Sequence, residues 1–422
     1  MRRTTKAGAA AASLALLLAA CSSGSDTATE ASSAAPEAGS GTFTIWADEV
    51  RTAPIQAECD KFAEANGITC EVVQIDFGEI RAKVVQGNQT GDVPDLFIGA
   101  HDWLGELVTN GVVTPFDLGS KAASFSEVSV EAVAYDGSSY GVPYAVENVA
   151  LLTNPALSPE CPASLDDLVS QGEKLRKDGD ASLPLALQIG AEGDAYHWYP
   201  LYSANGGYIF GQNADGSTNV EDMGVGQAGS IAAAESLQDM ADKKLIKASV
   251  TGDIAKESYN SGDSAWFITG PWNVPDALAA VPDTIVCPVP DGPSTSSAFI
   301  GVQTMFIPTK AANALIAQTF LNDYVMTTEF MDAIYAADPR PPAWTESAQK
   351  VSADPIVAGF IEYGLQGIPQ PSVPEMGAVW ESLGLAEFKV ASGEDPTTTM
   401  EEAGRPSPRQ SPGRSSQGTL IN

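Results

Sequence analysis

Apolar and polar positions along the first hundred residues predict strands and helices in alternation. Residues 42–46 alternate like a strand, and the apolar residues of 54–66 recur at the spacing of one helix face. Gly67 follows at the position where glycine commonly ends a helix. The pattern continues with strands at 69–75 and 95–99 and with helices at 79–87 and 102–110. Alternation with short connections predicts a mostly parallel α/β sheet.

A second series of strand and helix patterns begins near Asn148. Ser164 with Asp167 predicts the start of a helix, because a Ser side chain can accept a hydrogen bond from the backbone three residues further on. The strand patterns cover 149–153, 183–189, 264–268 and 299–308, and the helical patterns cover 164–177, 226–243, 313–325, 328–336, 351–364 and 375–391. Two α/β bodies of similar size are expected, with a cleft between them that suits a small ligand.

Composition narrows the classes of function. The chain has 422 residues, of which 54 are Asp or Glu and 22 are Lys or Arg, so its formal net charge is −32. This acidic excess argues against nucleic-acid binding, which needs a basic surface. Only 2 histidines are present, so we expect no metal site and no cofactor. Hydrophobic residues make up 44% of the chain, which is enough for folded cores, and the acidic surplus is interpreted as a solvated surface.

The N-terminus has the pattern of an export signal. Two Arg and one Lys precede an apolar stretch over 7–20, which is shorter than the ~20 residues of a membrane-spanning helix. The stretch closes with Leu-Ala-Ala-Cys21, which resembles the bacterial lipoprotein cleavage box. Residues 1–20 are therefore expected to be a lipoprotein signal peptide, and Cys21 the residue that carries the acyl chains. The alternative is an ordinary secretory signal with an incidental Cys.

Two further segments lack the apolar residues that a folded core requires. Residues 21–41 consist mainly of Ser, Ala, Gly and Thr, and they are expected to be a flexible linker between the lipid and the folded body. Residues 405–422 change abruptly to Arg, Pro and Ser without any acid. We expect this end to be a disordered tail, with a divergent terminus as the alternative, and assign it no function. A lipid and a linker together place the protein at the extracellular face of the cell membrane.

Apart from Cys21, the chain contains four cysteines, an even number for an oxidising compartment. No Cys-x-x-Cys pair occurs, so zinc and thioredoxin-like chemistry have no support. Four cysteines allow three pairings. Proximity and the helix–strand arrangement favour Cys59–Cys70, which leaves Cys161–Cys287. Both are interpreted as structural disulfides.

Two enzyme motifs have to be considered. Residues 137–141, Gly-Ser-Ser-Tyr-Gly, match the nucleophile-elbow pattern, but that motif needs a helix directly after it and Pro143 opposes one. A β-turn that enters a strand explains these glycines better. A glycosidase needs a pair of carboxylates, but no local spacing selects two of the many acids. We therefore predict that the protein is not an enzyme.

Aromatic residues recur beside carboxylates at the ends of predicted elements. Such pairs suit sugars, because a ring covers the apolar C–H face while acids accept protons from hydroxyl groups. The residues concerned are Asp102 with Trp103, Tyr144 with Glu147, a single loop with Asp194, Tyr196, His197 and Trp198, and also Trp272 and Trp380. The alternative for each Trp is core packing, which we favour for Trp46 and Trp266 inside strands.

Eight short motifs occur along the chain in the order of a known family. They are Trp-Ala-Asp at 46–48, Gly-Asp-Val-Pro-Asp at 91–95, Ala-His-Asp at 100–102, Gly-Val-Pro-Tyr-Ala-Val-Glu at 141–147, Ala-Asn-Gly-Gly-Tyr at 204–208, Gly-Pro-Trp at 270–272, Phe-Ile-Gly-Val at 299–302 and Val-Pro-Glu-Met at 373–376. With them the chain resembles the maltose/maltodextrin-binding proteins of bacterial extracellular solute-binding protein family 1, the receptors of ABC importers. The resemblance covers nearly all of 42–404.

The resemblance implies a two-lobed periplasmic-binding-protein-like α/β fold of type II, with lobes joined by hinge strands around a central ligand cleft. The N-terminal lobe would contain 42–146 and 299–338, and the C-terminal lobe 147–298 and 339–404. The ligand-binding residues carried over are Asp48, Arg51, Asp102, Trp103, Tyr144, Glu147, Asp194, Tyr196, His197, Trp272, Gln370 and Trp380. Among these the acids and Arg51 would bind hydroxyl groups, and Tyr196, Trp272 and Trp380 would stack on sugar rings.

This sequence departs from the maltose receptors at three positions of the implied site. Trp103 stands where those receptors have Arg, Gly99 where they have Trp, and Gly384 where they have another Arg. The general sugar-binding prediction is unaffected, but the exact sugar is left open.

The function implied is that of a lipid-anchored, monomeric receptor that captures malto-oligosaccharides and delivers them to the permease subunits of an ABC transporter. The alternatives are a receptor for another oligosaccharide, a secreted glycan-cleaving enzyme, and an adhesin or structural lipoprotein.

Overall fold

The computed structural model describes residues 41–213 and 217–405. The predicted signal peptide, Cys21, the linker up to residue 40 and the tail from residue 406 onward lie outside these residues. No helix in the described ranges combines the length and the apolar character needed to cross a membrane.

The first sheet has the strand order β14-β13-β3-β1-β2, and β6 also pairs with β13, outside this order. Its strands are β1 (Thr42–Ala47), β2 (Thr69–Gln74), β3 (Leu96–Ala100), β6 (Val142–Glu147), β13 (Phe299–Phe306) and β14 (Ile368–Pro369). β1 is parallel to β2 and β3, whereas β13 is antiparallel to β3 and β6. The prediction of a mostly parallel sheet is therefore right for β2-β1-β3 and for the short pairing of β13 with β14. β13 enters from a distant part of the chain, and an apolar pattern does not encode its direction.

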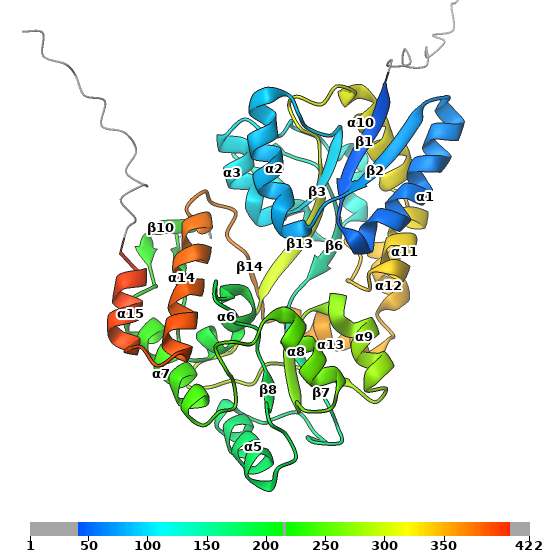
Figure 1. Ribbon diagram of the computed structural model, residues 1–422. Helices are drawn as coiled ribbons and strands as arrows, with labels where there is room; N and C mark the ends of the chain where they lie inside the picture. Colours follow the sequence, from blue (N-terminus) through cyan, green and yellow to red (C-terminus); the bar gives the residue numbers. More distant parts are fainter. Residues whose placement is uncertain (1–40, 214–216, 406–422) are drawn as a thin grey trace, which may run out of the picture. The chain divides into compact units, whose positions relative to one another are not determined.

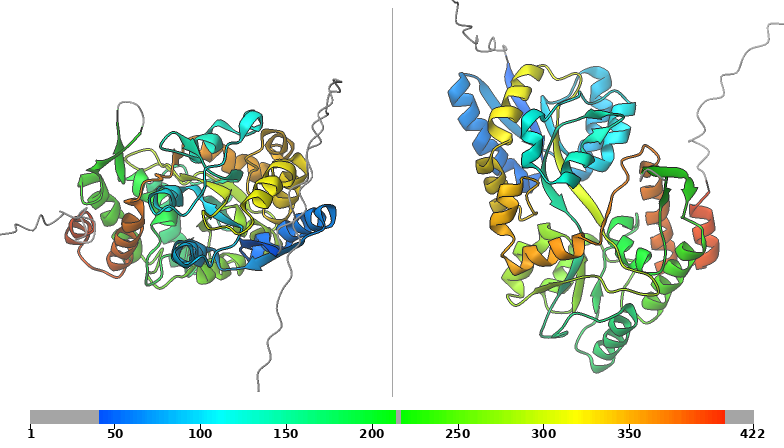
Figure 2. Two further views of the ribbon diagram at one scale, coloured as in Figure 1. Left: turned by 90° about the horizontal axis from the view of Figure 1, so that it is seen from above. Right: turned by 180° about the vertical axis from the view of Figure 1, so that it is seen from behind.

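Helices and helical turns surround this sheet, in the upper part of Figure 1. They are α1 (Glu49–Asn66), α2 (Phe77–Thr90), η1 (His101–Trp103), α3 (Leu104–Thr109), η2 (Gly119–Ser124), α4 (Glu127–Ala132), α10 (Ala314–Phe320), η4 (Leu321–Val325), α11 (Thr328–Ala337) and α12 (Thr345–Val351). Seen from behind, α11 and α12 continue one another along the side of the sheet (Figure 2). Phe43 and Phe62 stack edge-on with Phe320 in the core they enclose.

The second sheet has the order β12-β7-β11-β8. Its strands are β7 (Ala150–Thr153), β8 (Leu185–Ala186), β11 (Trp266–Thr269) and β12 (Ile285–Cys287). The surrounding elements are α5 (Leu165–Asp178), α6 (Ala195–Ala204), α7 (Ala228–Asp242), α8 (Gly252–Asn260), η3 (Pro271–Asn273), α9 (Val274–Ala280), α13 (Pro355–Gly364), α14 (Met376–Ala391) and α15 (Pro396–Ala403), with the hairpin of β9 (Phe210–Gln212) and β10 (Thr218–Met223). β7 is antiparallel to both neighbours, so this sheet too departs from a parallel one.

β6 and β13 run from one hydrophobic core to the other. Phe299 at the start of β13 is buried in the core around the second sheet, whereas Met305 and Phe306 near its end are buried in the core around the first. Tyr144 of β6 belongs to the first core, and Val149 directly after β6 belongs to the second. We call β6 and β13 the crossing strands. The boundaries given above for the two lobes stay predictions.

α1 begins five residues before the position that the sequence predicted. Asp48 precedes the helix, and its side chain accepts a hydrogen bond from the backbone N–H of Arg51. An Asp at this position stabilises a helix start by about 1 kcal/mol. Pro54 had been expected in the first turn of the helix, but it lies inside the helix. The predicted end is confirmed, because Gly67 adopts a left-handed conformation with φ of 66°.

Three other predictions of local structure are wrong. Residues 183–189 contain only the two-residue strand β8, because this segment is buried among helices without further strand partners. The loop predicted around Asp194 is the start of α6, which Asp194 caps. The helix predicted over 351–364 begins only at Pro355, because Asp354 caps a new helix there and Val351 is the last residue of α12. The turn at Gly137 is confirmed between β4 (Ala134–Tyr135) and β5 (Ser138–Ser139).

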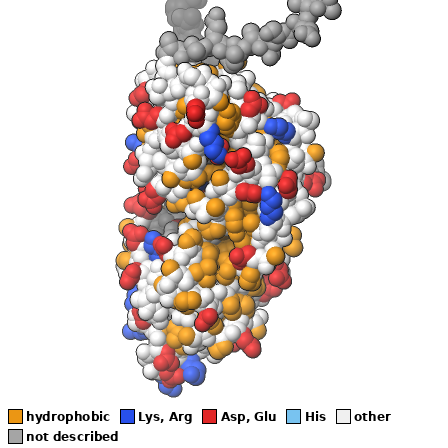
Figure 3. Space-filling view, turned by 90° about the vertical axis from the view of Figure 1, so that its right-hand side faces the viewer, with side chains coloured by type: hydrophobic (Ala, Val, Ile, Leu, Met, Phe, Trp, Pro, Cys, Tyr) orange, Lys and Arg blue, Asp and Glu red, His pale blue; other side chains and the backbone are white. Residues whose placement is uncertain are grey.

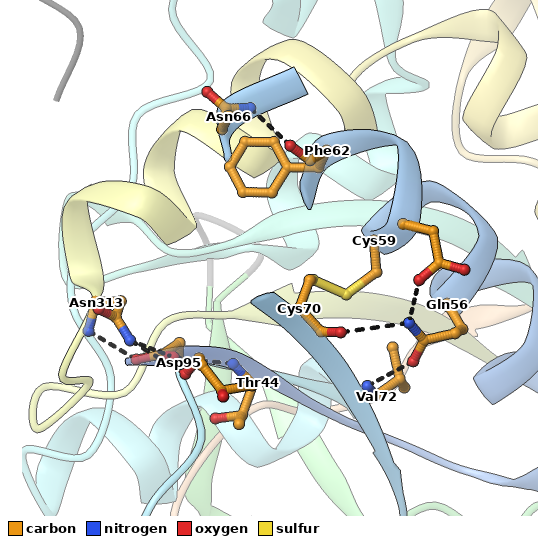
Figure 4. Close-up of a disulfide and its surroundings, with 11 residues drawn as sticks. Thr44, Gln56, Cys59, Phe62, Asn66, Cys70, Val72, Asp95 and Asn313 are labelled. Atoms are coloured by element: carbon orange, nitrogen blue, oxygen red, sulfur yellow. Dashed lines mark hydrogen bonds between the residues drawn. A yellow bond between two sulfur atoms is a disulfide. The ribbon is translucent and has the colours of Figure 1, made fainter. Parts of the chain in front are cut away.

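Both predicted disulfides are confirmed. Cys59 of α1 is bonded to Cys70 of β2, and Cys161 is bonded to Cys287 of β12. Figure 4 shows that Gln56, one helical turn before Cys59, holds the same strand by accepting from the Val72 N–H at 2.8 Å. The two bonds fasten one helix and one loop to the sheets that they cover.

Acidic side chains are spread over the face that Figure 3 shows, with few basic ones between them. They do not form a single block on this face. This distribution agrees with the interpretation of the net charge as a solvated surface.

Candidate ligand-binding cleft

A cavity of about 450 Å³ lies where the crossing strands meet the helix starts of both cores. This volume is in the usual range for a small-molecule site. The residues that line it are Asp48, Glu49, Val50, Arg51, Gln74, Asp76, Phe77, Glu147, Tyr196, Trp272, Gln303 and Arg340. Five of the twelve residues predicted for the site are thus brought together here: Asp48, Arg51, Glu147, Tyr196 and Trp272.

Asp48 and Arg51 form a buried ion pair on one wall of the cavity. Nε of Arg51 lies 3.0 Å from both carboxylate oxygens of Asp48, and Nη2 also donates to Asp48. Nη1 donates to Tyr144 Oη and, at 2.8 Å, to Gln303 Oε1. Burial alone would raise the pKa of Asp48, but the hydrogen bonds and charge of Arg51 hold it below its ordinary value. Every nitrogen of this guanidinium therefore already has a partner within the protein.

A second polar cluster in the lining of the cavity joins the crossing strands. Glu147, the last residue of β6, accepts from Gln303 Nε2 of β13 at 2.8 Å and from Arg340 Nε. Arg340 also donates through Nη1 to Asp338, which is 1% exposed and does not line the cavity. Buried carboxylates are thus compensated by buried guanidinium groups, as low-dielectric surroundings require.

Aromatic rings supply the apolar surface of the cavity. Phe77 starts α2 in the first core, while Tyr196 on α6 and Trp272 on η3 pack against the second. The rings of Tyr196 and Trp272 are 6.4 Å apart and tilted by 32°. Tyr196 Oη is buried without a hydrogen-bond partner among the described residues, and burial raises the pKa of this hydroxyl well above its ordinary value. It is therefore a neutral donor that a ligand oxygen can satisfy.

Asp194 and His197 flank Tyr196 in the sequence but do not line the cavity. Asp194 caps α6 by accepting from the His197 N–H at 3.0 Å and also accepts from Gln188. Burial would raise the pKa of Asp194, but its contacts with His197 and Gln188 keep it lowered. Glu387 of α14 accepts from the Asp194 N–H, and burial, followed by the charge of Asp194, raises its own pKa well above the usual range. These residues fix the helix start that presents Tyr196.

Asp102, Trp103 and Trp380 form a neighbouring group outside the lining of the cavity. Trp380 Nε1 of α14 donates to Asp102 Oδ2 at 3.4 Å, which joins the second core to the first. Asp102 Oδ1 is buried and has no partner among the described residues, and burial raises the pKa of Asp102 to about 6. Trp103 is 7% exposed and packs on Phe77, with ring centroids 5.0 Å apart.

Two of the departures from the maltose receptors have a steric explanation. A Cβ at residue 99 would lie 2.7 Å from the ring of Trp103, so this ring fills the space that a side chain at Gly99 would need. Gly384 lies against the loop before α6, where a Cβ on Gly193 would come within 1.7 Å of the Gly384 carbonyl oxygen. A larger residue at 384 would also press on this loop, because its Cβ would meet the Glu192 oxygen at 3.0 Å.

The remaining predicted residues are buried close to the crossing strands. Tyr144 is 1% exposed and binds Arg51. Gln370 contributes its backbone carbonyl, which lies 3.1 Å from His101 Nε2. His101 Nδ1 accepts from the Val302 N–H at 3.0 Å, so the ring is neutral with its proton on Nε2. This histidine ties β13 to the segment that carries Gln370.

The pKa shifts of His101 and Asp102 predict opposite effects of acid on the stability of the protein. Burial lowers the pKa of His101 to about 4, so the unfolded chain takes up the proton first and stability falls as the pH drops from 6.5 to 4. The raised pKa of Asp102 means that the folded chain takes up its proton first, so stability rises between pH 6 and 4. Each effect amounts to roughly 3 kcal/mol at most.

We expect His101→Gln to reveal the effect of Asp102, because a neutral amide can keep both hydrogen bonds but does not titrate. Urea denaturation should show that the variant loses less stability than the wild type between pH 6.5 and 4. Parallel stability curves for the two proteins over this range would contradict the assignment.

Sequence reasoning missed seven of the residues that line the cavity: Glu49, Val50, Gln74, Asp76, Phe77, Gln303 and Arg340. Phe77 follows the helix cap Asp76, a local pattern that was available, and Gln303 is a polar residue inside an apolar strand. Arg340 had no such indication, since it stands in a connection rich in Pro. Among the described residues, no group of three or more His, Cys, Asp or Glu is arranged to hold a metal ion.

Comparison with known proteins shows which family and which relatives this chain is similar to. The family described as bacterial extracellular solute-binding protein matches residues 57–359. A maltooligosaccharide ABC transporter solute-binding lipoprotein of Streptococcus pneumoniae is 26% identical over 85% of each chain. Two proteins of Bacillus subtilis are similarly related. Its galactooligosaccharide-binding protein is 25% identical over 89% of this chain and 90% of that relative, and its maltodextrin-binding protein is 26% identical over 85% and 87%.

Proposed function

The chain belongs to the bacterial extracellular solute-binding proteins, and we propose that it captures maltose and maltodextrins and delivers them to the permease subunits of an ABC importer. Solute-binding proteins of ABC importers for oligosaccharides are the class that its relatives represent. The cavity carries the proposal, because its lining combines aromatic rings from both cores with the carboxylate residues Asp48 and Glu147. Rings cover the C–H faces of a sugar and carboxylates accept its hydroxyl protons.

Ligand capture would work through closure of the two proposed lobes about the crossing strands. The closed state would bind the sugar more tightly, and the permease would recognise that state. The residues proposed to bind directly are Asp48, Arg51, Glu147, Tyr196 and Trp272, which line the cavity. Asp102, Trp103, Tyr144, Asp194, His197, Gln370 and Trp380 complete the proposed site around them.

Titration of the soluble body from Gly41 with sugars tests the proposal. Tryptophan fluorescence should change saturably with maltose, maltotriose or a cyclodextrin, because Trp272 lies in the cavity. Xylobiose serves as the control disaccharide and should cause no change. No response to any glucan would contradict the maltodextrin proposal.

A galacto-oligosaccharide is the second candidate ligand. The relative of that name in Bacillus subtilis covers this chain as fully as the maltodextrin-binding relatives do. Saturation with a galacto-oligosaccharide alone would keep the receptor and change its ligand. The proposed absence of enzyme activity is tested in the same series, since chromatography after long incubation should recover the bound sugar unchanged.

We further propose that the receptor is a monomer, anchored by acyl chains on Cys21 at the extracellular face of the membrane. The relatives in Streptococcus pneumoniae are described as lipoproteins, which supports the anchor. Mass spectrometry of the N-terminal peptide from membrane-extracted protein tests it. A diacylglyceryl group on Cys21 is expected, and an unmodified thiol would contradict the proposal.

A further inference from the structure

We propose that Arg340 binds the ligand directly, by donating a hydrogen bond from Nη2 to a sugar oxygen in the cavity. This inference rests on the proposed function and adds a binding residue that neither the motifs nor the resemblance indicated. Arg340 lies between α11 and α12, is 8% exposed and lines the cavity. It is therefore placed to contact a ligand while most of its side chain is held by the protein.

The hydrogen bonds of Arg340 leave one nitrogen free. Nε donates to Glu147 and Nη1 donates to Asp338. Nη2 makes no hydrogen bond to any residue that the structure describes. A guanidinium carries five N–H donors and stays charged at all physiological pH values. The contrast with Arg51 is informative, because Nε, Nη1 and Nη2 of Arg51 are all occupied by protein oxygens. Arg340 is thus the guanidinium of this cavity that still has donors to offer.

The surroundings of Arg340 indicate the kind of oxygen that it accepts. Its Cζ lies 5.1 Å from the ring centroid of Trp272, so a sugar packed against this part of the cavity lies within reach of the guanidinium. Glu147 and Asp338 compensate the positive charge, and Glu49 and Asp76 stand at the cavity without ion-pair partners among the described residues. The local charge therefore disfavours an anionic ligand. A neutral acceptor, such as a hydroxyl or acetal oxygen of an oligosaccharide, suits the site.

The position of Arg340 also relates ligand contact to the crossing strands. Pro341, its neighbour, accepts from the Val146 N–H of β6 at 2.8 Å. Glu147 at the end of β6 receives hydrogen bonds from both Arg340 and Gln303 of β13. A sugar oxygen held by Nη2 is therefore linked to β6 through the hydrogen bond from Arg340 to Glu147, and to β13 through the further hydrogen bond from Gln303 to Glu147. A ligand bound by Arg340 would therefore be connected to the crossing strands, which join the two cores.

Three variants of the soluble body test the inference by isothermal titration calorimetry with the best-bound sugar of the series above. Arg340→Gln removes the guanidinium, and Arg340→Lys keeps a positive charge beside Glu147 and Asp338 but lacks the planar fork. Both should bind about 10- to 100-fold more weakly, the loss expected for one charge-assisted hydrogen bond. Asp338→Asn is the matched control, because it disturbs the same guanidinium but leaves Nη2 in place. Its affinity should stay within about threefold of the wild type.

The outcomes separate this inference from the proposed function. Arg340→Gln leaves two buried acids less compensated, so thermal melting is recorded for each variant, and Arg340→Lys carries the test if Arg340→Gln does not fold. Wild-type affinity in the folded Arg340 variants would overturn the inference and leave the receptor function standing. An equal loss in Asp338→Asn would also overturn it, because the network and not the donor would then matter. A wild-type protein that binds no sugar of the series overturns both.

Discussion

Replacing both Trp272 and Trp380 with Ala should lower the affinity for the preferred glucan by about 100- to 1000-fold. A buried aromatic side chain contributes roughly 2 kcal/mol through its contact area; we assign one such loss to ligand contact by Trp272 and one to the contacts of Trp380 with Tyr196 and Asp102, which together give this range. Trp272 lies in the cavity itself. Trp380 acts from the side, where it packs near Tyr196 with ring centroids 6.5 Å apart and donates to Asp102. Both rings are only half-buried, so the melting transition should stay cooperative.

The single variants should differ in a way that the structure explains. Trp272→Ala removes ligand contact directly, whereas Trp380→Ala frees Asp102 Oδ2 and loosens the link between the two cores. Calorimetry is the appropriate measurement, because the variants lack part of the fluorescence signal. Trp344→Phe is the control, since Trp344 packs edge-on against Phe125 and does not line the cavity, so its replacement by another aromatic ring should leave affinity unchanged. Intact sugar binding in the double variant would show that the proposed site is wrong.

The reliable sequence predictions were those that depend on local pattern or on simple counts. Cysteine number and spacing gave the correct disulfides, and Gly67 gave the correct helix end. Asp48 shows how one side chain can move a boundary, since its cap outweighs the preference of Pro54 for the first turn. The direction of β13 could not be predicted, because the apolar pattern of a strand buried on both faces is the same in either direction.

The cavity was predicted only in part, because some of its residues belong to no local pattern. Asp48, Glu147 and Trp272 belong to motifs that the family resemblance supplied. Arg340 and Gln303 reach the cavity only because β13 and the connection after α11 are folded against β6, which is a property of the tertiary structure. Trp103 illustrates the opposite case: the resemblance carried it over as a ligand-binding residue, but it fills the space beside Gly99 and packs on Phe77.

The largest effect on stability is expected from Arg51→Met. Arg51 is 1% exposed and forms the buried ion pair with Asp48, so its removal leaves a carboxylate without its charged partner. Breaking a buried pair from one side typically costs 3–5 kcal/mol, about the range that we expect at pH 7. Denaturation in urea, followed by circular dichroism, should show this loss as a lower midpoint with an unchanged slope.

The double variant Asp48→Asn with Arg51→Met should recover part of that loss. Asn keeps the helix cap, because its side-chain oxygen can still accept from the backbone N–H of residue 51, but it carries no charge. The four proteins of this cycle should give a coupling energy of about 2 kcal/mol or more between the two sites. Strictly additive effects would show that the pair contributes little, and the buried guanidinium would then need another explanation.

Acid should reduce the cost of Arg51→Met, which separates a charge effect from a packing effect. In the wild type the pKa of Asp48 is lowered, so the stability that the pair provides is present above the unfolded value of 3.8 and is lost as the pH falls further. Without Arg51, burial raises this pKa instead, so protonation favours the folded variant as the pH falls toward 3.8. The difference between wild type and variant should therefore shrink between pH 7 and 4. A difference that stays constant over this range would assign the loss to packing of the Arg51 side chain against Phe77 and Tyr144, which its guanidinium approaches to 5.0 and 5.9 Å.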